Sequence, residues 1–201
     1  MTRTVVVTCG ATVPFPGLVE AILDLNFLHA IHERWGFGRV IIQYGKGYNV
    51  EFEKRMRFLG SEPERKDTVV EISKKLGVEL EFYGRVGGVE ICGFAFTTAI
   101  QDLLRTHADV VVSHAGTGSI LDALRLQKRL VVVANTGLMD NHQMQITDRL
   151  ESRGHLVAAH ETSSAAVLEA ISVLERQAPV PLASGTSAVG FTNLLMNVAT
   201  S

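Results

Sequence analysis

The chain has 201 residues, 46% of them hydrophobic, which is enough to bury the core of about one domain. Its 19 basic and 21 acidic side chains leave a formal net charge of -2, so bulk charge gives no reason to expect a nucleic-acid partner. No apolar run approaches the roughly 18 to 20 residues of a membrane span, and no signal-peptide pattern opens the chain. Cys9 and Cys92 lack metal-ligand spacing and are expected to be buried, reduced thiols.

Short runs of β-branched residues recur along the chain without polar interruption, as in strands buried on both faces of a parallel sheet. The expected strands are residues 4–8, 39–43, 89–92, 109–113, 130–134 and 156–159. Helical patterns separate them, and the first is expected to run through Leu18, Ile22 and Leu25 after Pro16. Further helices are expected before Asp109, after Ser119, up to Gly154 and after Ser163 or Ser164. This alternation predicts an α/β fold, a Rossmann-like doubly wound parallel sheet.

Two segments depart from this alternation. Residues 44–88 carry much of the charge, with acidic and basic side chains interleaved, which favours a solvated helix and loop over an anion or membrane-surface patch. Residues 184–201 are apolar and nearly uncharged, which is unusual for an exposed terminus. We therefore expect a ligand-binding domain at residues 1–178 and a C-terminal tail at residues 179–201 that docks on a partner.

Three strand-to-helix turns are expected to meet where open parallel sheets bind their ligands, beyond the carboxyl ends of the strands. The first turn holds Gly10, Ala11 and Thr12. The second is the stretch SHAGTGS, residues 113–119, and the third is ANTGLMDNHQ, residues 134–143.

The second turn has the features of an anion site. Gly116 and Gly118 permit close backbone approach, and Thr117, Gly118 and Ser119 offer free N–H groups at a helix start, where the helix dipole favours negative charge. His114, at the strand end, is placed to donate a hydrogen bond to the same phosphate. The alternative is a packed histidine and an ordinary serine cap.

Carboxylate and amide side chains extend the predicted site. Asp122 lies about one helical turn beyond Ser119 and suits ribose hydroxyls, although a first-turn acid that complements the helix dipole has the same pattern. Asp140, Asn141 and Gln143 in the third turn suit a ligand with many hydroxyls, such as a sugar, and helix capping is the alternative.

Other nucleotide and catalytic signatures are absent from the sequence. It has no G-x-G-x-x-G after the first strand, no P-loop, no G-x-S-x-G elbow and no recognisable zinc spacing. It also has no D-x-D motif. We therefore expect neither a cofactor nor a metal, and we expect backbone amides to neutralise the diphosphate.

The second turn resembles a known signature. His114, Gly116, Ser119, Leu121 and Asp122 match the pattern H-x-G-x-x-S-x-L-[DE] of the nucleotide-sugar half of GT-B glycosyltransferases. Together with VTCGATVPFPGLV and LMDNHQMQI, it resembles the catalytic subunits of the eukaryotic UDP-N-acetylglucosamine transferase that adds the second GlcNAc to the dolichol-linked oligosaccharide. The bacterial lipid II-forming GlcNAc transferase has a similar C-terminal domain.

This resemblance implies roles for the same residues. His114 and the two glycine turns would hold the diphosphate of UDP-GlcNAc, Asp122 the ribose, and Asp140 with Gln143 the GlcNAc. The segment with Gly93 and Phe94 resembles the uracil-contacting region, although a buried phenylalanine fits the sequence equally well.

The resemblance also implies a partner, because a complete GT-B enzyme has two such domains and this chain is long enough for one. A membrane-anchored subunit would bind the dolichol-linked acceptor, supply the catalytic base and hold this chain peripherally on the cytosolic face of the endoplasmic reticulum. Two other interpretations remain. One is a nucleotide-sugar-binding regulatory module without turnover, and the other is a dehydrogenase-like domain, which the missing glycine fingerprint disfavours.

Overall fold

The computed structural model describes residues 2–10, 13–61, 63–134 and 141–182. In these residues, seven strands form one sheet: β1 (Arg3–Thr8), β2 (Phe37–Gln43), β3 (Phe82–Val86), β4 (Val89–Phe94), β5 (Val110–His114), β6 (Arg129–Val133) and β7 (Val157–Ala159). The described ranges also contain eight helices: α1 (Pro16–Ile22), α2 (Leu25–Trp35), α3 (Asn49–Phe58), α4 (Lys66–Leu76), α5 (Ile100–His107), α6 (Thr117–Arg125), α7 (Asn141–Ser152) and α8 (Ser164–Arg176).

The strand order is β3-β4-β2-β1-β5-β6-β7, and every neighbouring pair is parallel except β3 and β4. Without β3, this is the order of a doubly wound nucleotide-binding sheet, with the crossover direction reversing between β1 and β5. The six strands expected from the sequence are all present, so the predicted Rossmann-like α/β fold is confirmed.

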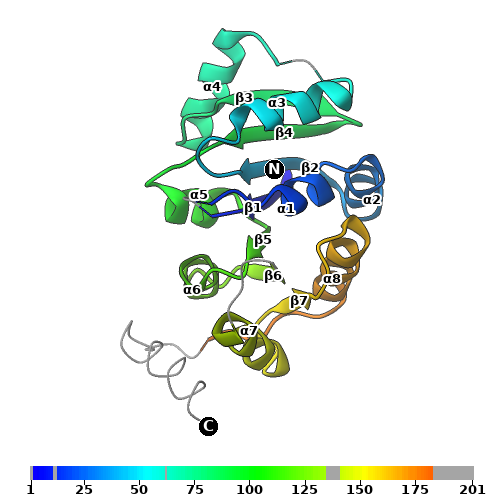
Figure 1. Ribbon diagram of the computed structural model, residues 1–201, viewed down its shortest axis with the longest axis vertical. Helices are drawn as coiled ribbons and strands as arrows, with labels where there is room; N and C mark the ends of the chain where they lie inside the picture. Colours follow the sequence, from blue (N-terminus) through cyan, green and yellow to red (C-terminus); the bar gives the residue numbers. More distant parts are fainter. Residues whose placement is uncertain (1, 11–12, 62, 135–140, 183–201) are drawn as a thin grey trace.

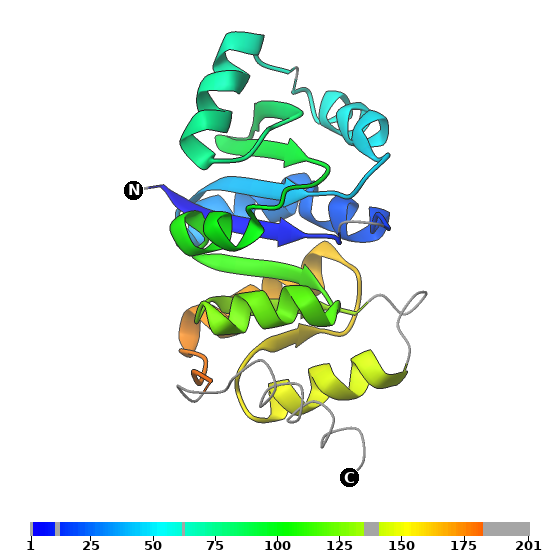
Figure 2. The same cartoon turned by 90° about the vertical axis from the view of Figure 1, so that its left-hand side faces the viewer.

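Helices cover both faces of the sheet (Figure 1). Successive residues of β1 point to opposite faces, so Val5 and Val7 join one core cluster and Val6 joins the other. The first cluster packs against α1, α2, α3 and α8, and the second against α4, α5, α6 and α7. Figure 2 shows α5 and α6 in front of the strands and α8 behind them.

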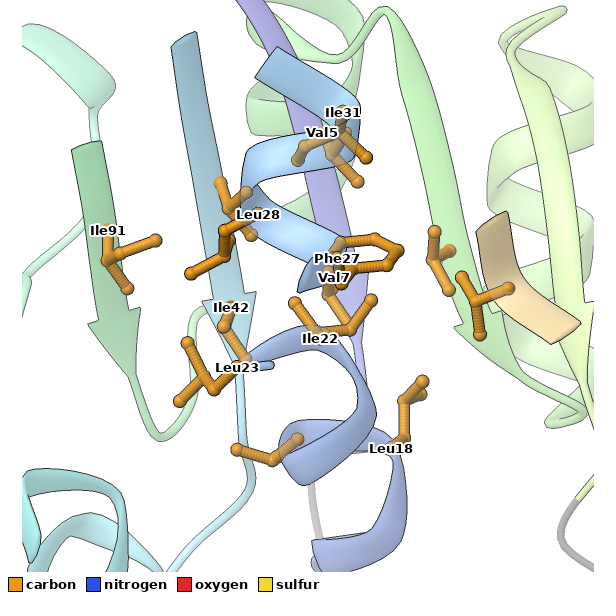
Figure 3. Packing of buried hydrophobic residues seen from close by; sticks show 14 of the residues in the cluster. Val5, Val7, Leu18, Ile22, Leu23, Phe27, Leu28, Ile31, Ile42 and Ile91 are labelled. Atoms are coloured by element: carbon orange, nitrogen blue, oxygen red, sulfur yellow. The ribbon is translucent and has the colours of Figure 1, made fainter. Parts of the chain in front are cut away.

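The first core cluster is packed around Phe27 of α2, which is fully buried (Figure 3). Leu18 and Ile22 of α1 and Val7 of β1 belong to the same cluster. Burial of such side chains contributes roughly 1.5 to 3 kcal/mol each. This packing fixes the start of α1 relative to the end of β1, and the first predicted turn lies between them.

The helix expected to continue from Pro16 through Leu25 is two helices. Helix α1 ends at Ile22, and Asp24 begins α2 by accepting a hydrogen bond from the Phe27 N–H at 3.0 Å. Leu25 is consequently 53% exposed instead of buried. A capping aspartate at this point breaks the apolar period that otherwise suggests one helix.

Replacing Asp24 by alanine is expected to lower the free energy of unfolding by about 1 kcal/mol, because the first turn of α2 loses its side-chain acceptor. Asp24→Asn keeps an acceptor oxygen and is expected to stay within a few tenths of a kcal/mol of the parent. Urea denaturation of both variants measures the difference. Equal destabilisation by the two substitutions would show that the cap is not the cause.

Residues 44–88 contain more structure than the predicted solvated helix and loop. Helix α3 buries Phe52 and Met56 in the core, and β3 adds an antiparallel edge strand beside β4. The charged residues occupy the outer faces of α3 and α4, so the interleaved charge is solvated as expected.

Most of the predicted tail lies outside the described residues. Its first residues pack on the domain, since the Val180 N–H donates to Gly154 O at 2.8 Å and the Val180 carbonyl accepts from His155 Nδ1 at 2.8 Å. The division at residue 178 and the docking of residues 183–201 on a partner remain predictions.

Candidate functional site

The carboxyl ends of the central strands lie in register at one edge of the sheet. Thr8 pairs with Gln43 of β2 on one side and with Ser113 of β5 on the other. The hydroxyl groups of Thr8 and Ser113 are hydrogen-bonded at 3.0 Å, which ties the two strand ends together. The first two predicted turns begin here, at the reversal of crossover direction where such sheets bind ligands.

His114 connects these two turns. Its Nδ1 lies 3.1 Å from the carbonyl oxygen of Thr8, which can only accept, so Nδ1 carries the proton. A Cβ on Gly116 would lie 2.3 Å from His114 Nε2, and one on Gly10 would lie 3.2 Å away. Gly10 also has a φ of +93°, which side chains rarely adopt. The imidazole therefore occupies space that exists because both neighbours are glycine.

This hydrogen bond determines what His114 offers a ligand. Burial lowers its pKa below the ordinary value, and the bond to the Thr8 carbonyl offsets part of that effect. With Nδ1 donating to the backbone, Nε2 of the neutral ring is an acceptor. Donation to a phosphate, as the sequence suggests, therefore requires the imidazolium form.

The first N–H groups of α6 have no hydrogen-bond partner among the described residues. Gly116 is its N-cap residue, with extended backbone and no side chain to accept from the first turn. Thr117, Gly118 and Ser119 form that first turn, and a Cβ on Gly118 would meet no atom within 4 Å. With respect to the described residues, the helix start thus combines free donors, the positive end of the helix dipole and open space, as an anion site requires.

A cavity of about 210 Å³ unites residues from both predicted turns and from elements that the sequence did not single out. Gly10, Gly118, Ser119 and Asp122 line it among the predicted site residues. The Asp122 carboxylate accepts a hydrogen bond from Gln101 Nε2 at 2.9 Å, which orients it from α5. The remaining lining residues are Thr8, Gln43, Phe96, Thr97, Ile100 and Leu104.

Phe94 does not line this cavity. Strand β4 continues past Cys92 to Phe94, whose side chain is fully buried in the second core cluster. Phe96, two residues further on and 45% exposed, lines the cavity together with Thr97. The aromatic side chain that lines the cavity is thus two residues beyond the predicted one, because β4 is longer than its β-branched run suggests. The contact of Phe94 with the base stays a prediction.

Several predicted residues lie outside the part of the chain that the structure describes. These residues are Ala11, Thr12 and Asp140. The side chains of Asn141 and Gln143 are not described either, although their backbone forms the start of α7. Their roles in phosphate and sugar binding stay predictions. Gln43 was missed because it closes an apolar strand, and only its register beside Thr8 places it at the site.

A larger cavity of about 640 Å³ lies at the β7 edge of the sheet, between β7, α8 and residues 177–180. Its lining includes Val157, Ala170 and Val180 but none of the predicted site residues. Within residues 2–10, 13–61, 63–134 and 141–182, no group of three or more His, Cys, Asp or Glu side chains could hold a metal ion. In the same residues, no helix is long and apolar enough to cross a bilayer.

Comparison with known proteins agrees with this geometry. Residues 4–193 match the model of the glycosyltransferase family 28 C-terminal domain. The UDP-N-acetylglucosamine transferase subunit ALG13 of Eremothecium gossypii is 46% identical over 198 residues, 98% of this chain and 93% of the relative. Its namesake in Saccharomyces cerevisiae is 40% identical over 183 residues, 90% of each chain.

Solved structures of glycosyltransferases have the same fold as this chain. The solution structure of ALG13 has 34% identity and a TM-score of 0.78, with 100% of this chain and 98% of that one covered. MurG of Acinetobacter baumannii, at 10% identity and a TM-score of 0.60, shares the fold, and this chain spans 50% of it. The chain has the fold of one half of a GT-B enzyme and belongs to glycosyltransferase family 28, in the group of the ALG13 transferase subunits.

Proposed function

We propose that this chain is the catalytic subunit of an inverting transferase that moves GlcNAc from UDP-GlcNAc to GlcNAc-diphosphodolichol. The observation that carries the proposal is the seating of His114 between Gly10 and Gly116, beside the uncapped start of α6 and the cavity that holds Asp122. In this arrangement, the α6 N–H groups stabilise negative charge on the diphosphate as UDP leaves. Asp122 accepts from the ribose hydroxyls.

The acceptor half of the enzyme is proposed to come from a membrane-anchored subunit on the cytosolic face of the endoplasmic reticulum. One observation supports a second component: the relatives are named as subunits. The catalytic base is assigned to that component.

Reconstitution tests both parts of the proposal. The full chain is mixed with membranes that carry the partner and a GlcNAc-diphospholipid, and transfer from labelled UDP-GlcNAc is measured, with and without excess EDTA. We expect a product one GlcNAc longer, which requires both components and survives EDTA. Binding of UDP-GlcNAc without any transfer would favour the alternative of a regulatory binding module.

Asp122→Ala is expected to raise the KM for UDP-GlcNAc and the inhibition constant of UDP by about the same factor, roughly tenfold, because both ligands lose the ribose acceptor. Asp102→Ala is the matched control, since Asp102 is an exposed acid on α5 that pairs with Arg105. It should change neither constant by more than about twofold. Unchanged UDP inhibition in Asp122→Ala would remove this carboxylate from the ribose site.

The affinity for UDP-GlcNAc is expected to fall as pH rises. His114 is held mainly neutral in the free chain because burial lowers its pKa, whereas a diphosphate beside Nε2 favours the imidazolium and raises that pKa. Affinity is therefore highest below the free-state pKa and decreases until pH exceeds the ligand-bound pKa, by roughly tenfold for each unit between the two. Titrations between about pH 5 and 8 cover this range.

His114→Asn supplies the comparison. It keeps a side-chain amide near Thr8 but does not titrate, so its affinity should be independent of pH over the same range. A wild-type affinity that is equally flat would show that His114 does not contact the diphosphate.

A further inference from the structure

A lysine that the sequence motifs leave unused lies beside the proposed donor site. Lys46 stands in the loop between β2 and α3, with Gly45 on one side and Gly47 on the other. The φ angles of these glycines are +91° and +80°, in the left-handed region that side chains rarely adopt. The loop is therefore built from residues that allow a tight turn and project one charged side chain from it.

Packing holds this loop against the first predicted turn. A Cβ on Gly45 would lie 3.2 Å from the Gly10 carbonyl oxygen and 3.3 Å from the Pro14 Cα. Gly45 therefore packs against Gly10, and Lys46 is the next residue in the chain. Gly10 in turn lines the cavity and lies against His114. The backbone of the loop is packed at Gly45, while the lysine side chain has a flexible four-carbon stem.

The Lys46 ammonium group rests on an aromatic wall of the cavity. Its Nζ lies 5.1 Å from the centroid of the Phe96 ring, in the geometry of a cation–π contact. It forms no ion pair within the described part of the chain, in contrast to Lys54 on α3, which pairs with Glu51 at 2.8 Å. An exposed cation–π contact is worth only roughly 0.5 to 1 kcal/mol, so a stronger anionic partner displaces it readily.

A diphosphate in this cavity would need a positively charged side chain nearby to balance its charge. Among the described residues that line the cavity, Asp122 alone is charged, so this wall has the same sign as a nucleoside diphosphate. The N–H groups of α6 supply roughly half an elementary charge, and the imidazolium form of His114 proposed for the complex adds one, which together is still less than the two negative charges of a diphosphate diester. Lys46 is a full positive charge attached next to the same cavity.

We infer that Lys46 binds a diphosphate at the mouth of the cavity, moving from the Phe96 ring to the phosphate oxygens when the ligand arrives. This inference rests on the proposed function and adds a binding residue to it. The diphosphate of the nucleotide sugar and that of the lipid acceptor share the required chemistry, and the two arms of the test separate them.

The test compares Lys46→Met, which keeps an apolar stem and removes the charge, with Lys46→Arg and with the control Lys54→Met. Binding of UDP and of uridine to the full chain is measured first, followed by the KM for the diphospholipid acceptor and for UDP-GlcNAc in the reconstituted membranes. Lys46→Met is expected to weaken UDP roughly tenfold, as loss of a charge-assisted contact does, and to leave uridine within about twofold. Lys46→Arg should restore most of the loss, and Lys54→Met should match the wild type.

Unchanged UDP binding with a tenfold higher acceptor KM assigns Lys46 to the lipid diphosphate. No change in any of these constants overturns the inference, and so does an equal loss of UDP and uridine, because that reports a distorted cavity. A wild-type chain that neither binds UDP nor transfers GlcNAc overturns the proposed function together with this inference. A wild type that does either, next to a Lys46→Met variant that behaves identically, overturns the inference alone.

Discussion

Replacing Gly116 by alanine is expected to lower GlcNAc transfer by roughly 100-fold or more. The added Cβ would lie 2.3 Å from Nε2 and 2.8 Å from Cε1 of His114, far inside van der Waals contact. The ring has little freedom to yield, because Nδ1 is hydrogen-bonded to Thr8 and Gly10 lies against it. A displaced imidazole moves away from the diphosphate that it is proposed to contact, and misplacement of such a group by about 1 Å costs approximately two orders of magnitude in rate.

The double variant distinguishes this cause from a general loss of folding. If Gly116→Ala acts through the imidazole, the same substitution in a His114→Ala background should add less than about threefold, because the clashing ring is gone. Initial transfer rates and melting temperatures of the four chains provide the comparison. A Gly116→Ala chain with a rate within about threefold of the wild type would contradict the steric argument.

The second large effect concerns stability. Arg39→Met is expected to reduce the free energy of unfolding by about 3 kcal/mol, because it leaves the Glu90 carboxylate between β2 and β4 without its buried counter-ion. The two side chains are 10% and 15% exposed and lie 2.6 Å apart from Nη2 to Oε2. Tyr83 and Arg85 remain as partners of the other Glu90 oxygen, so the lower end of the usual range applies.

Arg85→Met is the matched control for the same carboxylate. Arg85 pairs with Glu90 at 2.8 Å, but its side chain is 58% exposed, so its removal should cost less than about 1 kcal/mol. Urea denaturation of both variants measures the two costs. Equal destabilisation would show that burial does not decide the strength of these pairs.

The Arg39→Met cost should also depend on pH. In the wild type, burial pushes the pKa of Glu90 upward, but Arg39, Tyr83 and Arg85 together hold it below its usual range. This pair therefore stabilises the fold above the unfolded-state pKa of about 4.3, and the contribution is lost as pH falls through the folded-state pKa. Without Arg39 the carboxylate protonates at higher pH, so the difference between variant and wild type should shrink as the solution is acidified from neutral.

The site follows from the sequence only in part. His114, Ser119 and Asp122 are predictable because a β-branched run, two glycines and an amphipathic segment place them at a strand end and a helix start. Gln43 and Phe96 are not predictable in this way. Their positions at the cavity depend on the pairing of β2 with β1 and of β4 with β2. The proton position on His114 depends on the Thr8 carbonyl, 106 residues away in the chain.

The sequence by itself determined the doubly wound fold, six of the seven strands in the described residues and the position of the second strand-to-helix turn, since these depend on local periodicity and backbone requirements. Only the tertiary structure decided where α1 ends, that residues 82–86 form an edge strand, that Phe96 and not Phe94 faces the cavity, and that Lys46 lies beside it. The physical reason is the same in each case. A short strand, a strand end or a loop position is fixed by contacts with segments distant in the chain, and such contacts leave no period in the sequence.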